Sequence, residues 1–129
     1  MGKILVCGSL ESETLEYLRA NADVTVAPDN SKETVIDLLR QGMEAIILRG
    51  YHITDEIIES APSLKVIARV AAGYNEINLD LCAKKKIFVC NSPGGNANAT
   101  AEMTIGFFFA LGRQIIPMHN DYVRGRFNT

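Results

Sequence analysis

The 129-residue sequence contains no tryptophan, three cysteines, two histidines and a nearly balanced formal charge of −2. Cys7, Cys82 and Cys90 are odd in number and show no C-x-x-C spacing, so the sequence indicates neither a disulfide framework nor a zinc site. We therefore expect reduced thiols, as in a cytoplasmic protein. Without an excess of lysine and arginine, the chain also lacks the electrostatic footprint of a nucleic-acid-binding protein.

Long apolar runs are missing as well. The most apolar stretch, residues 103–111, is followed by Arg113, far short of the ~20 residues that a membrane span requires. The N-terminal residues show no charged-then-apolar signal pattern. His52 and His119 stand apart from any pattern typical of a hydrolase or a metal site, so we interpret both as structural. These absences predict a cytoplasmic protein with no metal site, no membrane contact and no nucleic-acid partner.

Short apolar runs do alternate with helical segments along the whole chain. Because strands that are apolar on both faces and alternate with helices are typical of parallel sheets, we expect an α/β fold with flanking helices. Five such units favour a flavodoxin-like sheet of order 2-1-3-4-5. The predicted strands cover residues 4–7, 24–26, 45–48, 66–68 and 87–90.

The pattern also predicts where helices begin and end. Ser12, Ser31 and Thr54 are expected to cap three of them at the N-terminus, and Gly42 to end the second. We expect a flavodoxin-like domain over residues 1–98. A long connecting helix should then run from about residue 99 to residue 121, kinked or divided by Pro117.

Ligands of such sheets bind beyond the carboxyl ends of the strands. The loop at residues 70–75 follows the fourth strand and is small, so its N–H groups could approach a carboxylate. Spacing alone favours a plain tight turn.

Arg49 and Arg69 end the third and fourth strands. Either could clamp a carboxylate in a bidentate fork or make a surface salt bridge, which is the commoner case. Residues 91–96 are dense in turn residues but contain no dinucleotide fingerprint.

Several of these segments together resemble a known family. The stretch LKVIARVAAGYNEINL (residues 64–79) resembles the strand and glycine-rich loop of the D-isomer-specific 2-hydroxyacid dehydrogenases, which include phosphoglycerate dehydrogenase. KIFVCNSPG (residues 86–94) resembles their Gly-Ile-x-Val-x-Asn-x-Pro segment, and residues 99–102 resemble the start of their Val-Ala-Glu helix. Further family motifs match at residues 111–113 and 125–127. The motifs leave open which hydroxy acid is the substrate, and whether the cofactor is NAD or NADP.

The resemblance implies a role for each matching position. Substrate binding would fall to Arg49, Gly50 and the backbone of Ala71, Ala72 and Gly73. Ala72 would also lie near the nicotinamide of NAD, and Thr100 would face the cofactor. Cleft-shaping positions would be Arg69, Asn91 and Pro93.

The sequence departs from the family in ways that bear on function. Asn75, Glu76 and Asn78 stand where the family usually has Asp, Asn and Asp, and Lys86 replaces a turn glycine. The family's G-x-G-x-x-G domain and its catalytic arginine, glutamate and histidine have no counterpart within these 129 residues. We therefore expect the N-terminal, substrate-side portion of an NAD-dependent enzyme, inactive by itself. The alternative is a non-enzymatic module, derived from that family, that binds a small acid or a protein.

The last predicted helix is apolar nearly all round. Such helices are normally buried, so we expect this one to need a covering surface. The prediction is a symmetric homodimer formed through residues 99–121.

Overall fold

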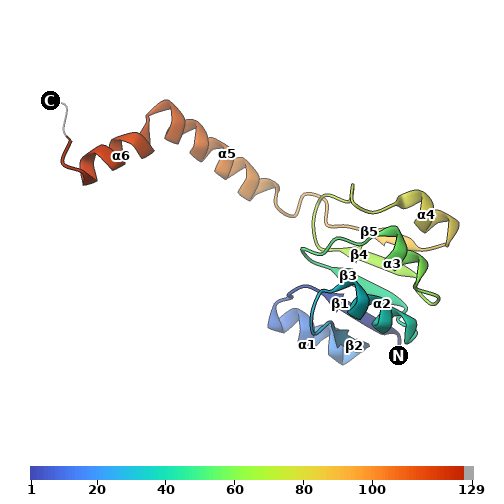
Figure 1. Cartoon of the computed structure of the whole chain (residues 1–129). Helices are drawn as coiled ribbons and strands as arrows, with labels where there is room; N and C mark the ends of the chain where they lie inside the picture. Colours follow the sequence, from blue (N-terminus) through green and yellow to red (C-terminus); the bar gives the residue numbers. More distant parts are fainter. Residues whose placement is uncertain (127–129) are drawn as a thin grey trace. The chain divides into compact units, whose positions relative to one another are not determined.

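The computed structural model (Figure 1) describes residues 1–126. Phe127, part of the last family motif, lies outside the described residues. Contacts divide the chain into a compact unit, Met1–Pro93, and a second unit that begins at Gly94.

The first unit is built on a five-stranded parallel sheet of order β2-β1-β3-β4-β5, which confirms the predicted topology. The carboxyl ends of all five strands therefore lie along one edge. The strands are β1 (Lys3–Cys7), β2 (Asp23–Val26), β3 (Ala45–Leu48), β4 (Val66–Arg69) and β5 (Phe88–Cys90).

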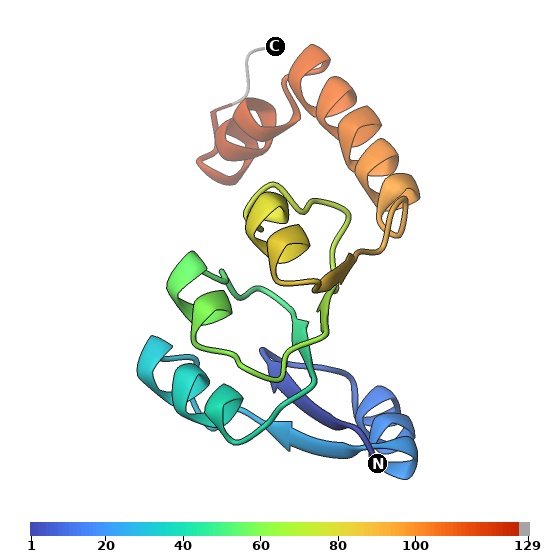
Figure 2. The same cartoon turned by 90° about the vertical axis from the view of Figure 1, so that its right-hand side faces the viewer.

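Four helices flank this sheet. Figure 2 shows α2 (Lys32–Arg40), α3 (Asp55–Glu59) and α4 (Leu79–Lys84) on one face and α1 (Ser12–Asn21) on the other. The register aligns Leu5, Ile46 and Ile67 across the three central strands, and all three side chains are fully buried. The core of the unit therefore lies between the sheet and the layer of α2, α3 and α4, whose inward side chains include Val35, Leu39, Ile57, Ile58 and Cys82.

The two predicted ends of α2 are confirmed. The Ser31 side chain accepts a bond from the Thr34 N–H, and Gly42 follows α2 with φ +88°. Asn78 caps α4 by accepting from the Leu81 N–H at 3.0 Å. The prediction for Ser12 is wrong, because Ser12 is the first residue of α1 and Glu11 stands at the cap position.

Thr54 occupies the predicted N-cap position of α3 but makes no capping hydrogen bond. Its Oγ1 is buried and has no hydrogen-bond partner among residues 1–126. The first turn of α3 instead carries Asp55 and Glu56, whose negative charge suits a helix N-terminus. The prediction is thus correct for position and wrong for the capping bond.

The second unit contains two helices, α5 (Ala97–Gly112) and α6 (Ile115–Val123), so the segment predicted as helical over residues 99–121 is divided rather than kinked. The break falls at Arg113 and Gln114, where Gln114 takes a left-handed φ of +51°. Pro117 causes no break, because it lies in the first turn of α6, where a helix needs no N–H donor. Neither helix buries a residue, and none of the helices within residues 1–126 is long and apolar enough to span a membrane.

Candidate functional site

A close backbone contact at Gly8 joins the carboxyl ends of β1 and β3. The Arg49 N–H donates to the Cys7 carbonyl at 2.9 Å, and Gly8 takes φ +98°. A Cβ atom at Gly8 would stand 1.9 Å from the Arg49 carbonyl oxygen, so only glycine fits there. This contact fixes the backbone from which the Arg49 side chain projects.

Arg49 carries a largely uncommitted guanidinium. Its Nη1 lies 3.7 Å from Glu11 Oε1, and the Arg49 side chain is 44% exposed. An exposed ion pair of this length contributes little and is easily replaced by another anion. The following Gly50 has a left-handed φ of +66° and open space around it. The end of β3 therefore presents a cation next to an unobstructed turn.

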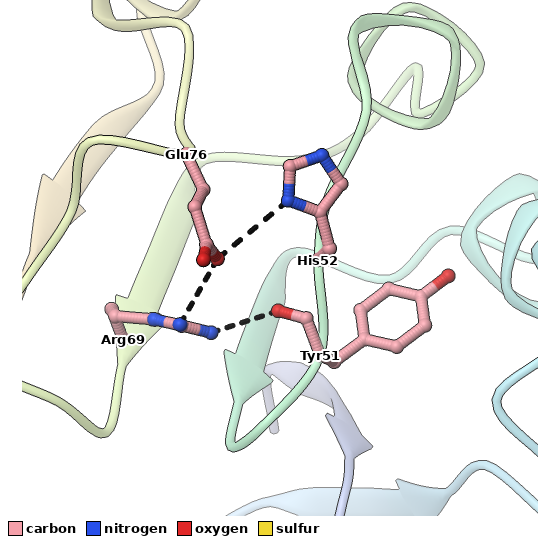
Figure 3. Close-up of polar contacts among 4 residues, drawn as sticks. All are labelled: Tyr51, His52, Arg69 and Glu76. Carbon is pink, nitrogen blue, oxygen red and sulfur yellow. Dashed lines mark hydrogen bonds and ion pairs between the residues drawn. The ribbon is translucent and has the colours of Figure 1, made fainter.

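Arg69, at the end of β4, is committed to protein partners. Its Nη1 donates to the Tyr51 carbonyl at 2.8 Å, and its Nη2 donates to Glu76 Oε2 at 3.1 Å (Figure 3). The Arg69 side chain is only 13% exposed. Of the two possibilities for this arginine, the structure shows the salt bridge. The Arg69 guanidinium thereby links the loop after β3, through Tyr51, to the loop after β4, through Glu76.

His52, for which the sequence indicates a structural role, has an acidic neighbour from another loop. Its Nδ1 lies 3.6 Å from Glu76 Oε2, the same carboxylate oxygen that Arg69 contacts (Figure 3). His52 follows β3 and Glu76 follows β4, so their distance along the chain conceals the contact. The adjacency of β3 and β4 in the predicted sheet order was the one signal that could have revealed it.

The loop after β4 has its carbonyl groups and its N–H groups in different environments. The Ala71 carbonyl accepts from the Ser92 N–H at 3.0 Å, and the Ala72 carbonyl accepts from Asn91 Nδ2 at 2.7 Å. The N–H groups of residues 71–76 donate to no acceptor within residues 1–126. Exposed, unpaired N–H groups in a fixed turn can bind an anionic oxygen.

A shallow hollow of about 300 Å³ adjoins this loop. It is lined by Tyr74, Leu79, Val89 and Asn91. Asn91 is therefore shared between the wall of the hollow and the bond that fixes Ala72. The predicted position Pro93 is the last residue of the first unit. Thr100 lies on α5, where its hydroxyl donates to the Asn96 carbonyl at 2.8 Å.

No activated thiol is found in the buried part of the first unit. Burial raises the pKa of the Cys7 thiol to about 12, and burial also raises that of Cys82. Both thiols are therefore protonated near neutral pH and behave as small core residues. Across residues 1–126, no three His, Cys, Asp or Glu side chains are grouped so that they could hold a metal ion.

Comparisons with known proteins agree with this geometry. Residues 4–129 match the family model described as the D-isomer specific 2-hydroxyacid dehydrogenase, catalytic domain. The chain is 30% identical to the D-3-phosphoglycerate dehydrogenase of Methanocaldococcus jannaschii, covering 99% of this chain and 24% of that protein. The crystal structure of the PH0520 protein from Pyrococcus horikoshii matches with a TM-score of 0.82 and 32% identity, covering 100% of this chain and 39% of that one.

A third relative was solved with its cofactor. The NAD⁺-bound 3-phosphoglycerate dehydrogenase of Entamoeba histolytica gives a TM-score of 0.72 at 31% identity, covering 84% of this chain and 38% of that one. The chain thus spans between about a quarter and two fifths of these three proteins. The residues matched, the parallel sheet and the two structural likenesses all support one assignment. The chain belongs to the D-isomer specific 2-hydroxyacid dehydrogenase family.

Proposed function

We propose that this chain is the N-terminal, substrate-binding portion of an NAD-dependent oxidoreductase that acts on a D-2-hydroxy acid or the corresponding 2-oxo acid. One observation carries the proposal. The N–H groups of Ala71, Ala72 and Gly73 are unpaired within residues 1–126, while the carbonyl of Ala71 is held by the Ser92 N–H and that of Ala72 by Asn91 Nδ2. A substrate carboxylate would accept hydrogen bonds from these N–H groups.

Arg49 would supply the positive charge that such a carboxylate needs. β3 and β4 are neighbours, so the end of β3 lies beside the loop after β4. The weak 3.7 Å pair with Glu11 would give way to a charge-assisted bond with the substrate. Gly50 would leave room for the acid. Arg69, Asn91 and Pro93 would shape the cleft around it.

Of the NAD cofactor, this chain would contact only the nicotinamide end. Ala72 is exposed and small, as a position beside a flat ring requires, and Thr100 is the second proposed contact. Residues 1–129 contain no G-x-G-x-x-G loop to hold a pyrophosphate. When bound, NAD would supply or accept a hydride. This chain's own residues would hold and orient the acid, and none is assigned as catalytic.

We further propose that residues 1–98 form the substrate-binding domain and that residues 99–129 begin the NAD-binding domain. The exposed apolar side chains of α5, among them Phe107, Phe108 and Leu111, would be covered in a symmetric homodimer. Light scattering at high protein concentration tests the dimer, and a monomer there would exclude it.

The binding claim can be tested by isothermal titration calorimetry of the 129-residue chain with glyoxylate. We expect saturable binding that weakens roughly tenfold in Arg49→Gln, in line with the loss of a charge-assisted bond. Lys65→Gln serves as the control, because Lys65 pairs with Glu44 instead. Absence of saturable binding, or equal effects of the two variants, would contradict the proposal.

The claim that this chain is inactive by itself needs a separate assay. With NADH and glyoxylate, hydroxypyruvate or phosphohydroxypyruvate, the chain should give no change in absorbance at the nicotinamide band. Turnover above the protein-free rate would refute that claim.

The second candidate function is a non-enzymatic module that binds a small acid or a protein partner. The observation that favours it is the loop after β4, whose N–H groups are unpaired within residues 1–126 and could bind any small anion. Sequencing the coding region past Thr129 separates the two. A G-x-G-x-x-G motif in frame supports the dehydrogenase, and a stop codon supports the module.

A further inference from the structure

The geometry points to Glu76 and Arg69 as positioning residues that hold the Ala71–Gly73 loop in its anion-binding form, an inference that rests on the proposed function. Neither residue needs to touch the acid for this role. Arg69 is largely buried, its Nη1 donates to the Tyr51 carbonyl, and its Nη2 donates to Glu76.

The argument begins with where the ion pair lies along the chain. Arg69 ends β4 and Glu76 lies seven residues later, so their bond closes the segment that contains the loop. Closing a short segment at both ends removes conformations that it would otherwise sample. The 2.8 Å bond from Arg69 to the Tyr51 carbonyl then joins that segment to the neighbouring loop.

Independent contacts hold the opposite side of the loop. Asn91 Nδ2 and the Ser92 N–H bind the carbonyls of Ala72 and Ala71. The loop is therefore fixed from the β3 side through Arg69 and from the β5 side through Asn91 and Ser92. The carbonyls of Ala71 and Ala72 are thus bonded within the protein, whereas the N–H groups of the loop stay available as donors. A binding site that is ordered before the ligand arrives avoids the entropic cost of ordering on binding.

Replacing Glu76 distinguishes a charge effect from a positioning effect, because the two predict opposite changes in anion affinity. Its carboxylate lies near a proposed anion site, so removing its negative charge should tighten anion binding if charge alone matters. If Glu76 acts by positioning, removing it should weaken binding because the loop loses order. His52 Nδ1 also lies near this carboxylate, 3.6 Å from Glu76 Oε2. His52 is left unchanged in all the variants below.

The experiment compares Glu76→Ala, Glu76→Gln and the control Glu56→Ala. Glu56 is also exposed and ion-paired, to Lys32 at 2.8 Å, but it lies on α3. Glyoxylate affinity should fall at least about fivefold in Glu76→Ala, because loop residues must then be ordered on binding. It should fall less in Glu76→Gln, which loses the same charge but keeps an acceptor for Arg69. The Glu56→Ala control should match the wild type.

A second readout needs no ligand. Backbone ¹⁵N order parameters of Ala72 and Gly73 should be near ~0.85 in the wild type and fall below ~0.6 in Glu76→Ala. Unchanged order parameters, or tighter binding that is equal in the two Glu76 variants, would overturn the positioning role. If the wild type binds no acid, the proposed function fails, and the order parameters still decide whether Glu76 holds the loop.

Discussion

The two units of this chain use their apolar residues in opposite ways. Every buried residue of the described chain lies between Leu5 and Ile87, in the unit built on the sheet. The helices α5 and α6 contain large apolar side chains and bury none of them, and Phe108 is 75% exposed. The first unit therefore has its own core, whereas the described helices of the second unit bury none of their residues.

This difference shows what hydrophobic pattern can and cannot predict. In the first unit, apolar residues recur at strand and helix spacing, and the strands and helices that contain them pack against one another in one core. In α5 the apolar residues surround the helix, so the pattern predicts burial without naming the covering surface. The following predictions test the contrast, from the largest expected effect to the smallest.

Thiol reactivity should separate the interior of the first unit from exposed positions most strongly. Burial that raises the pKa of Cys7 to about 12 reduces its thiolate fraction roughly a thousandfold relative to an ordinary thiol. Under native conditions at pH 8, alkylation followed by mass spectrometry should modify the exposed Cys90 and spare Cys7 and Cys82. In a dilute, monomeric sample a thiol introduced by Phe108→Cys should react as Cys90 does, and the proposed homodimer should protect it at high protein concentration.

Matched truncations should differ next. Ile46→Ala removes a fully buried side chain and should lower the free energy of unfolding of the first unit by about 2–5 kcal/mol. Phe108→Ala should change the same transition by less than about 0.5 kcal/mol. Urea denaturation followed by far-ultraviolet circular dichroism measures both. Equal effects would mean that α5 contributes to that core.

A glycine pair tests the site within the first unit. Gly8→Ala puts a side chain at a position with a left-handed φ of +98°, where its Cβ would lie 1.9 Å from the Arg49 carbonyl oxygen. The free energy of unfolding should therefore fall by at least about 2 kcal/mol. Gly73 has neither constraint, and Gly73→Ala should stay within about 1 kcal/mol of the wild type. Thermal denaturation of both variants provides the comparison. A well-tolerated Gly8→Ala would show that β1 and β3 do not approach as described.

The smallest expected effect concerns two left-handed residues, one in each unit. Lys86 has φ +59° and Gln114 has φ +51°. Lys86→Gly should raise the free energy of unfolding of the first unit by about 1 kcal/mol, because glycine has no Cβ to clash in this conformation. Gln114→Gly should leave that transition unchanged. A similar gain from both variants would couple the two units and contradict the contrast.

Much of the first unit could be predicted from local chemistry. Apolar runs gave the five strands, their alternation with helices gave the parallel sheet, and Ser31 and Gly42 marked the ends of α2. The positions of Arg49 and of the loop after β4 at one sheet edge followed from the topology. These features depend on neighbours in sequence or on strand order, both of which the pattern contains.

Other features depend on contacts that no spacing encodes. The Glu76 carboxylate contacts both Arg69 and His52 because two loops meet, and no spacing along the chain indicates that His52 has an acidic neighbour. The helix break at Gln114 was assigned to Pro117, since proline is the stronger breaker in a helix interior but is tolerated in a first turn. Whether the hydroxyl of Thr54 would cap depended on side-chain orientation, which a capping residue type does not determine.

The most direct test of the central claim is to map glyoxylate binding onto the chain by ¹H–¹⁵N correlation spectra. The proposed site predicts the largest saturable shifts at the N–H groups of Ala71, Ala72 and Gly73, with smaller shifts near Arg49. Residues Lys65, Lys85 and Lys86, which line a separate hollow, should not shift. Shifts confined to those lysines, or no saturable shift in the loop after β4, would contradict the assignment of this loop as the substrate carboxylate site.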